Sequence, residues 1–524
     1  MTVRAILPTR PVSDTGGVPV SPSRRLAVAR PVAPSTGRSV SWGLALLDQR
    51  GPILWWGGAA ISGAALLHAQ SIGSRWIWLT VVTAAAGLVW FVVRREPKPD
   101  APFAGRVGWR DARASMGSLP TSVLAPTVVA GVGTVANTLL GFRIGHGWVA
   151  VSVAVVLGAA AVGASLAPDR MRIGPVTPAF LFVLAHTFVV LLWLRATLSV
   201  NDVELVLREG SRELLAGHNP YAMTFPNVYS AEFAEQLYGP GFLVDNRIPY
   251  GFPYPPVLLL AAVPGYLLGD VRYGPLAALL AVALIAHGVG RRRTGRAAAV
   301  ALTTAPGAVN ILYAGWTEPF VVLLVAVVGL ALFSRRWMTA AVAIGVLLVS
   351  KQYFVVTVPC LWLLRAHATP RRVAALVGTA AVLTMPWLLA DPGAFLRSLV
   401  GYQVGAHLRT DSLSILVALV EGTGADSIAL RLVALPIGLL VAVIAARRLP
   451  AGPTGFLVAV AASLLATMLF SKQSFANYYL LVGYLLMILA WLPTRRPAPL
   501  SAGRKDPVAE PVDAPAAPQV ELLS

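Results

Sequence analysis

The sequence predicts an all-α protein, built as a polytopic bundle of transmembrane helices. Hydrophobic residues occupy 56% of the 524 positions and charged residues only 12%, and the mean hydropathy is +0.70. A soluble domain carries about a quarter charged residues because its surface faces water. Apolar runs also recur along the chain, many of them close to the roughly 20 residues that cross a bilayer core. These observations exclude a soluble globular enzyme.

Hydropathy predicts about fourteen spans, some of which are shorter than a full crossing. The predicted spans are Ile53–Ala69, Trp76–Val93, Thr121–Leu140, Trp148–Leu166, Pro178–Leu198, Tyr273–Gly290, Ala297–Ala314, Pro319–Ser334, Trp337–Ser350, Tyr353–Leu364, Val373–Ala390, Ile428–Ala446, Pro453–Phe470 and Phe475–Trp491. They divide the chain into a tail at 1–50, four N-terminal spans at 51–170, a core at 171–493 and a second tail at 494–524. Both tails are rich in proline and small residues, which predicts disorder.

The charge pattern predicts the orientation. The formal net charge is +19, and arginine pairs such as Arg335-Arg336, Arg371-Arg372 and Arg447-Arg448 fall between spans. Arginine and lysine mark cytoplasmic loops. With both termini inside, the arginine clusters lie on the cytoplasmic side of an inner membrane. No basic stripe carries interleaved stacking aromatics, so the charge does not predict nucleic-acid binding.

One apolar segment, Tyr254–Leu268, is not counted as a span. Counting it would reverse every later loop and place the arginines outside. We therefore predict an interfacial or re-entrant helix that starts at Pro255-Pro256 and is interrupted at Pro264.

The longest outer segment, 199–252, precedes that helix. It starts with Asn201-Asp202 and continues as an alternation of apolar and charged residues typical of a short amphipathic helix. The sequence GHNPY at Gly217–Tyr221 ends this helix, since glycine caps helices and Asn-Pro turns the chain. About fifty residues between membrane helices are too many for a simple connector.

Further polar residues gather on the same predicted side. Glu318 lies in a short turn, and the segment Asp391–Ser427 holds His407 and Arg409. Two Ser-Lys-Gln sequences, with Lys351 and Lys472, lie at outer helix ends. Cations at that position commonly meet an anion. Carboxylates and lysines on one side predict phosphate chemistry with a base nearby.

These motifs resemble the GT-C superfamily of integral-membrane glycosyltransferases, and most closely the polyprenyl-phosphate mannosyltransferases of glycosyltransferase family 87 and their relatives. The resemblance rests on Asn201-Asp202 after a span, then G-H-N-P-Y, then P-Y-P-P at Pro253–Pro256. It covers about 178–491. It implies transfer of a sugar, with mannose first and arabinose next, from a polyprenyl phosphate to a glycolipid or polysaccharide acceptor on the outer face.

The resemblance also implies roles for individual residues. Asp202 is the expected catalytic base, Glu318 a second acidic residue of the site, and Lys351, Lys472 and Arg409 the groups that meet the phosphate. The remaining expected substrate-binding residues are Gln352, Gln473, Asn477, His407, Asn219, Tyr221 and Tyr254. Metal dependence stays open, because Asp202 and Glu318 could share a divalent cation or act without one, and no other cofactor is predicted.

Each assignment has an alternative. Asp202 could cap the amphipathic helix, Glu318 could be a solvated turn residue, and the lysines could reach the outer headgroups. Asn219 and Tyr221 also fit a turn. For the whole chain, the alternatives are an arabinosyltransferase and a flippase or transporter of lipid-linked glycans. A transporter predicts inverted repeats and ionisable groups near the bilayer midplane, and the sequence shows neither.

Overall fold

The computed structural model describes residues 50–94, 121–142, 147–168, 171, 176–199, 201–289 and 292–492. They belong to one compact unit. The described residues are almost entirely helical, with two strands of two residues each that pair antiparallel, Phe225 opposite Ile248. The all-α prediction is confirmed for this part of the chain. The predicted tails lie outside it, except for Arg50, which begins the first described helix.

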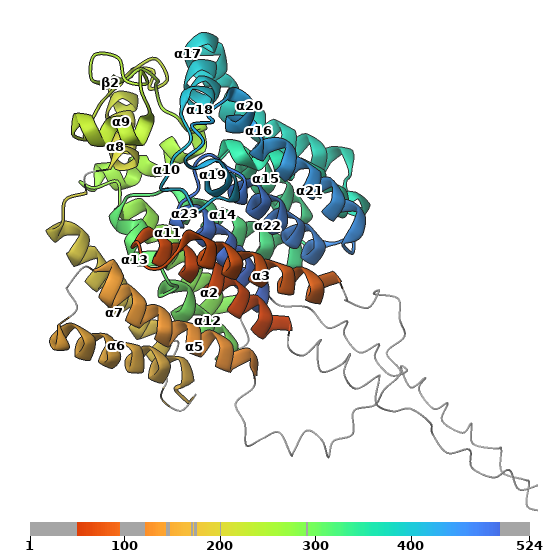
Figure 1. Ribbon diagram of the computed structural model, residues 1–524. Helices are drawn as coiled ribbons and strands as arrows, with labels where there is room; N and C mark the ends of the chain where they lie inside the picture. The colour runs from red at the N-terminus through yellow and green to blue at the C-terminus, as the bar shows by residue number, and fades with distance from the viewer. Residues whose placement is uncertain are drawn as a thin grey trace, which may run out of the picture. The chain divides into compact units, whose positions relative to one another are not determined.

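The helices up to the predicted re-entrant segment are shown in Figure 1. Their order is α2 (Arg50–Ala69), α3 (Arg75–Arg94), α5 (Thr121–Ala136), the π-helix η2 (Asn137–Gly141), α6 (Trp148–Leu166), α7 (Pro178–Ala196), α8 (Asp202–Leu215), β1 (Phe225–Pro226), α9 (Ala231–Tyr238), β2 (Arg247–Ile248) and α10 (Pro256–Leu267).

The second half continues with helices alone. Their order is α11 (Tyr273–Val289), α12 (Arg292–Thr303), α13 (Ala308–Tyr313), α14 (Glu318–Phe333), α15 (Trp337–Leu348), the 3₁₀ helix η4 (Gln352–His367), α16 (Pro370–Ala390), α17 (Pro392–Leu396), the π-helix η5 (Arg397–Gly401), α18 (Tyr402–Gly405), α19 (Ile415–Val420), α20 (Ile428–Leu432), α21 (Ala434–Arg448), α22 (Pro453–Leu469) and α23 (Ala476–Trp491).

Among the described residues, five helical segments are long and apolar enough to cross a membrane, which indicates a membrane protein. They are Ser122–Gly141, Trp148–Leu166, Pro178–Ala196, Pro370–Ala390 and Ile428–Arg448. Seven shorter apolar helices accompany them. Each predicted span overlaps a helix, but the count of about fourteen crossings remains a prediction.

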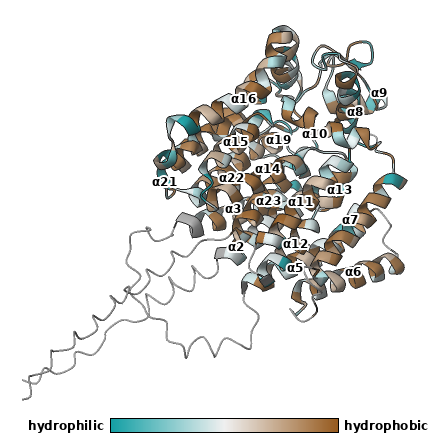
Figure 2. Cartoon of the chain, turned by 180° about the vertical axis from the view of Figure 1, so that it is seen from behind, coloured by the Kyte–Doolittle hydropathy of each residue, from teal (hydrophilic) through white to brown (hydrophobic). Residues whose placement is uncertain are grey.

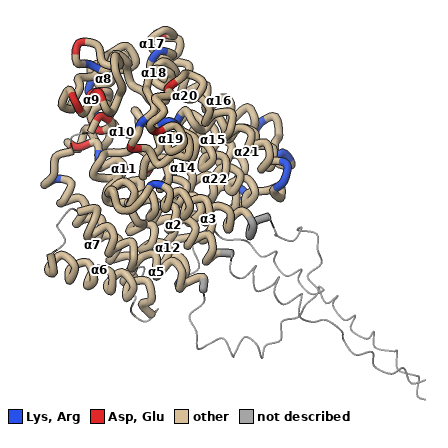
Figure 3. The backbone as a smooth tube through the Cα atoms, in the orientation of Figure 1, with Lys and Arg blue, Asp and Glu red and all other residues tan. Residues whose placement is uncertain are grey.

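Charge and hydropathy separate in the described residues. Apolar residues cover α5, α6 and α7 (Figure 2), whereas acidic and basic residues gather on α8 and α9 and near α18 to α20 (Figure 3). In the bundle, α23 is buried along most of its length. A second group of basic residues lies at the end of α21, which holds Arg447 and Arg448 (Figure 3).

The N-terminal helix α2 is part of this core rather than an appendage. It packs against α23, α3 and α5. A methyl group at Gly58 or Gly483 would overlap the backbone of the opposite helix, so α2 and α23 cross with their backbones in close approach. Small residues permit such crossings in membranes. The predicted N-terminal block at 51–170 is therefore integral to the helical unit.

The predicted span Ala297–Ala314 is wrong as a single helix. The chain breaks between α12 and α13 at Thr304–Gly307, where Gly307 has a φ of +90°. The amide of Asn137 fills the break. It donates to the carbonyls of Thr304 and Ala305 at 3.0 Å each and accepts from the amide of Gly307 at 3.2 Å. Because apolar surroundings offer no water, this side chain satisfies groups that the break leaves open.

The helix α10 has the predicted start but not the predicted interruption. It starts at Pro256, as proline at a first helical position favours, and continues through Pro264 to Leu267. Twelve residues rise about 18 Å, which is less than the bilayer core. It packs against α8 and α11, so its length supports a helix that does not cross.

We predict that Asn137→Ala destabilises the protein by roughly 1–3 kcal/mol, because buried backbone groups lose their partners. The measurement is thermal unfolding in detergent. Thr127→Ala is the control, since the Thr127 hydroxyl bonds only within its own helix, and it should unfold like the wild type. Equal unfolding temperatures for all three proteins would contradict the proposed role of Asn137.

Candidate active site

Asp202 is the first residue of α8, but it does not cap the helix. The N-cap is Asn201, whose side chain accepts from the amide of Val203 at 2.8 Å. The carboxylate of Asp202 instead accepts hydrogen bonds from the hydroxyls of Tyr229, at 3.3 Å, and Tyr238, at 3.2 Å. The capping alternative is therefore wrong, and the carboxylate is free to serve a polar site.

The two tyrosines come from the outer segment and stay protonated. Burial raises the pKa of both hydroxyls, and the nearby Asp202 carboxylate raises each pKa further. Tyr238 stacks on Phe242 with ring centroids 5.2 Å apart. The Tyr229 hydroxyl also accepts from the amide of Asp202 at 3.1 Å. The pair thus holds the Asp202 carboxylate in one orientation.

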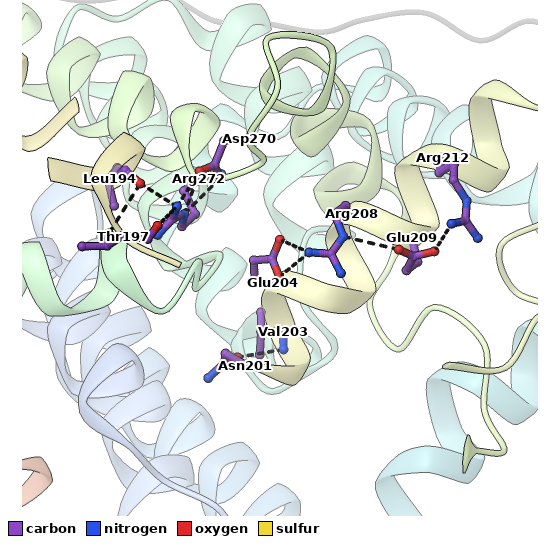
Figure 4. Close-up of polar contacts among 10 residues, drawn as sticks. All are labelled: Leu194, Thr197, Asn201, Val203, Glu204, Arg208, Glu209, Arg212, Asp270 and Arg272. Atoms are coloured by element: carbon purple, nitrogen blue, oxygen red, sulfur yellow. Dashed lines mark hydrogen bonds and ion pairs between the residues drawn. The ribbon is translucent and has the colours of Figure 1, made fainter. Parts of the chain in front are cut away.

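A charge network around Arg272 fixes the end of α7, the helix that precedes α8 (Figure 4). One Nη of Arg272 donates to the carbonyls of Leu194 and Thr197 at 2.7 Å each, and the same guanidinium pairs with Asp270. Carbonyls at the end of α7 have no helical partner, so Arg272 caps that helix.

Helix α8 carries a series of ion pairs along its length. Glu204 pairs with Arg208 at 3.0 Å, and Glu209 pairs with Arg208 and with Arg212 (Figure 4). Burial raises the pKa of Glu204, although Arg208 opposes the rise. These ion pairs lie within α8 and stabilise the amphipathic helix that the sequence predicts. Gly217, with a φ of +81°, follows its end as expected.

Asp202 lines a polar cavity of about 860 Å³. Its walls come from distant parts of the chain: the turn between α2 and α3, the outer segment around Tyr229 and Tyr238, the loop that precedes α19, and the start of α23. The expected site residues that line it are Asp202, Tyr254, Arg409, Gln473 and Asn477. The cavity is large enough for sugar rings and has a carboxylate in its wall.

Arg409 is one of the two arginines that line this cavity. Its guanidinium pairs with Asp411 at 2.6 Å and lies over the ring of Phe475 at 4.3 Å. The charge of Asp202 acts on Arg409, and Arg409 acts on the hydroxyl of Tyr478. A guanidinium there can meet an anion in the cavity while remaining anchored.

A second, mostly apolar cavity of about 480 Å³ adjoins the polar one. Aliphatic residues of α15, η4, η5, α20 and α21 line it, among them Val355, Val400 and Leu435, which are exposed on the surface. Four residues line both cavities: Tyr254, Gln403, Gln473 and Tyr478. The polar and apolar spaces therefore meet at one shared boundary.

The expected acidic partner Glu318 is not in either cavity wall among the described residues. It is fully buried and pairs with Lys351 at 2.9 Å. The Lys351 ammonium also lies 4.3 Å from the centre of the Tyr254 ring. Glu318 is therefore not the solvated turn residue of the alternative. It neutralises Lys351, which reaches only the apolar cavity.

Asp202 and Glu318 do not meet in a metal site. Among the described ranges, no group of three or more histidine, cysteine, aspartate or glutamate side chains could hold a metal ion. The carboxylate of Glu318 pairs with Lys351, and that of Asp202 accepts hydrogen bonds from two phenol hydroxyls. The geometry gives no support to the shared divalent cation that the sequence left open.

Lys472 lies at the edge of the apolar cavity. Its ammonium donates to the carbonyls of Gln403 and Ala406, near the end of α18. Burial, with a contribution from Arg431, lowers the pKa of Lys472 to about 8. The ammonium hydrogens bind these backbone carbonyls, so Lys472 shapes the cavity wall and does not project a free charge into the cavity.

The other expected binding residues divide between the two cavities and the scaffold. Gln352 donates to the carbonyl of Pro253 and lines the apolar cavity. His407 bonds Asp426 at 2.6 Å and lines neither cavity. Asn219 accepts from the amide of Tyr221 at 3.0 Å, and the Tyr221 hydroxyl donates to the carbonyl of Tyr254 at 2.9 Å. Asn219 and Tyr221 thus build a turn, as their alternative predicts.

Sequence reasoning missed several residues of the polar cavity. Tyr229 and Tyr238 carry no motif, and their alignment with Asp202 depends on how the outer segment folds back. Arg75 and Asp411 lie in the wall as well. Arg75 follows the first predicted span, and its position gave no signal because the resemblance starts at 178.

Comparison with protein-family models, with curated proteins and with solved structures finds no match to this chain.

Lys472 predicts a pH dependence of stability. Its pKa of about 8 in the folded protein lies below the ordinary 10.5, so the unfolded chain binds more protons between those values and stability rises with pH there. The thermal midpoint of the wild type should therefore rise relative to that of Lys472→Met from about pH 8 upward. Lys472→Arg, which stays charged, should lack this rise, and parallel profiles for wild type and Lys472→Met would contradict the prediction.

Proposed function

We propose that this protein is an integral-membrane glycosyltransferase that moves a sugar from a polyprenyl phosphate to an acceptor hydroxyl. One observation carries the proposal: a carboxylate, Asp202, lies in the wall of a polar cavity that shares a boundary with an apolar cavity. A polyprenyl-linked donor has one apolar and one polar part, joined by a phosphate. The two adjoining cavities fit these two parts.

The reaction is a direct displacement at the anomeric carbon. Asp202 removes the proton of the acceptor hydroxyl as its oxygen forms a bond to C1 of the sugar. The bond from C1 to the phosphate oxygen breaks, and the electron pair leaves with the polyprenyl phosphate. Tyr229 and Tyr238 orient the base, because each hydroxyl donates to a different oxygen of the Asp202 carboxylate.

The leaving phosphate gains negative charge and needs donors near the boundary of the two cavities. Arg409 supplies the charge from the polar side, and Gln473 lines both cavities. Lys351 remains neutralised by Glu318. We therefore assign the phosphate to Arg409 first, with Gln352, Gln473 and Asn477 as neutral donors around the donor and sugar.

The proposed setting follows the charge pattern of the loops. Both termini lie in the cytoplasm, and the polar cavity opens on the outer face of the inner membrane. Mannose is the first donor sugar to test and arabinose the next. The acceptor is a glycolipid or polysaccharide of the cell envelope.

The base is tested by Asp202→Asn. Membranes that contain the protein receive radiolabelled polyprenyl-phosphate mannose, and transfer should fall by at least about 10²-fold in the variant because an amide cannot take the proton. Glu209→Gln is the matched control, since Glu209 lies on the same helix and pairs outward with Arg212. It should retain wild-type transfer.

Equal transfer by Asp202→Asn and the wild type would remove Asp202 from the chemistry. If the wild type transfers neither mannose nor, in the same assay, arabinose or glucose, the glycosyltransferase proposal fails. The flippase is then the hypothesis to test.

The apolar cavity is tested by Val404→Trp. The larger ring fills part of the space lined by Val404 and Leu435, so half-saturation should need several-fold more polyprenyl-phosphate donor. Val382→Trp adds the same ring to an exposed position of α16 and should leave the donor requirement unchanged. If both substitutions leave it unchanged, the polyprenyl chain binds elsewhere.

A further inference from the structure

The turn between α2 and α3 forms one wall of the polar cavity. His68, Ser71, Ser74, Arg75 and Trp76 line it together with Asp202. The wall belongs to the first predicted spans, which lie outside the part of the chain that resembles a glycosyltransferase. An N-terminal helical hairpin therefore contributes side chains to the same space as the proposed base.

The hairpin is held firmly in place. Its first helix crosses α23 at Gly58 and Gly483 in close backbone contact. At the turn, the His68 ring lies 3.4 Å from the carbonyl of Asp411, in the loop that also carries Arg409. The turn is thus a fixed part of the cavity wall and is not a separate lid.

Arg75 provides the positive charge of this wall. Its Nη1 pairs with Glu421 at 2.9 Å, and its Nη2 donates to the carbonyl of Thr410. The Arg75 side chain is 14% exposed, whereas that of Glu421 is 51% exposed. The Nε of Arg75 is buried without a partner. Because the Glu421 side chain is half exposed, water can solvate its carboxylate after it leaves Arg75. Another anion can therefore replace it on the guanidinium at little cost in free energy.

The two arginines of the polar cavity occupy different positions. Both arginines line the polar cavity and not the apolar one. The backbone amide of Arg409 donates to the carbonyl of Lys472 at 3.0 Å, and Lys472 lines the apolar cavity, so Arg409 lies beside the boundary. Arg75 lies in the turn between α2 and α3 instead. A donor phosphate at the boundary therefore meets Arg409, and Arg75 remains for the molecule that fills the polar cavity.

We propose that the turn between α2 and α3 is the acceptor-binding wall and that Arg75 binds an anionic group, a phosphate or carboxylate, on the acceptor. This inference rests on the proposed glycosyl transfer. It assigns the N-terminal hairpin to acceptor recognition and makes the acceptor an anionic glycolipid or glycan. In the complex, the acceptor anion replaces Glu421 on the guanidinium, and its hydroxyl faces Asp202.

The test uses membranes containing the full chain, saturating radiolabelled polyprenyl-phosphate sugar, and increasing amounts of a lipid and glycan extract from the organism that encodes the chain. Arg75→Gln should raise the extract needed for half-maximal transfer by about tenfold while leaving the donor requirement unchanged. Arg75→Lys should restore part of the loss. The labelled product, freed of donor by mild acid, should bind an anion-exchange column.

Two further variants separate acceptor binding from a structural latch. Glu421→Gln removes the partner of Arg75 but keeps the guanidinium in the cavity, so it should need no more extract than the wild type. Arg365→Gln changes an exposed arginine that bonds within its own helix and should behave as wild type. If Glu421→Gln loses transfer as Arg75→Gln does, Arg75 acts as a latch and the inference is wrong.

The remaining outcomes are also decisive. A labelled product that does not bind the anion exchanger overturns the anionic acceptor. An unchanged extract requirement in Arg75→Gln, with an active wild type, overturns the role of Arg75 and leaves the glycosyltransferase proposal standing. Loss of all transfer in the wild type fails the proposed function instead.

Discussion

The buried pair of Glu318 and Lys351 is the interaction on which the site depends. Both side chains are almost completely removed from solvent, and an unpaired charge there would cost several kcal/mol. The pair joins the start of α14 to the head of η4, and it holds the ammonium against the ring of Tyr254. Tyr254 lines both cavities. The ion pair thus fixes the position of Tyr254, and with it the boundary between the polar and apolar cavities.

The same constraint explains how charge is used elsewhere in the protein. Arg272 caps α7 and pairs with Asp270, Lys472 binds carbonyls, and Arg409 pairs with Asp411. Each cation is attached to the backbone or to a carboxylate within a few residues of a helix end. Asp202 differs because phenol hydroxyls, and no cation, hold it. Neutral donors therefore orient the Asp202 carboxylate, without an ion pair to it among the described residues.

The fate of the expected site residues follows from what a sequence pattern can encode. Asp202 was found because it directly follows a span and opens an amphipathic segment, features that are local. Glu318 and Lys351 were found as polar residues at helix ends, but their pairing with each other joins positions 33 residues apart and could not be read from either turn. His407 was grouped with Arg409 by proximity in sequence, whereas the fold directs it to Asp426 and Arg431. Asn219 and Tyr221 proved to be a turn because their polar atoms bond backbone groups.

The sequence by itself determined the helical class, the positions of most helices and the segregation of charge from apolar runs, because hydropathy and helix signals act over neighbouring residues. It also located the amphipathic helix α8 and Asp202 at its start. Only the tertiary structure decided which side chains meet: the phenols on Asp202, the buried ion pair, the amide that fills the break between α12 and α13, and the N-terminal turn in the cavity wall. These contacts join residues tens to hundreds of positions apart, and packing alone brings them within hydrogen-bond distance.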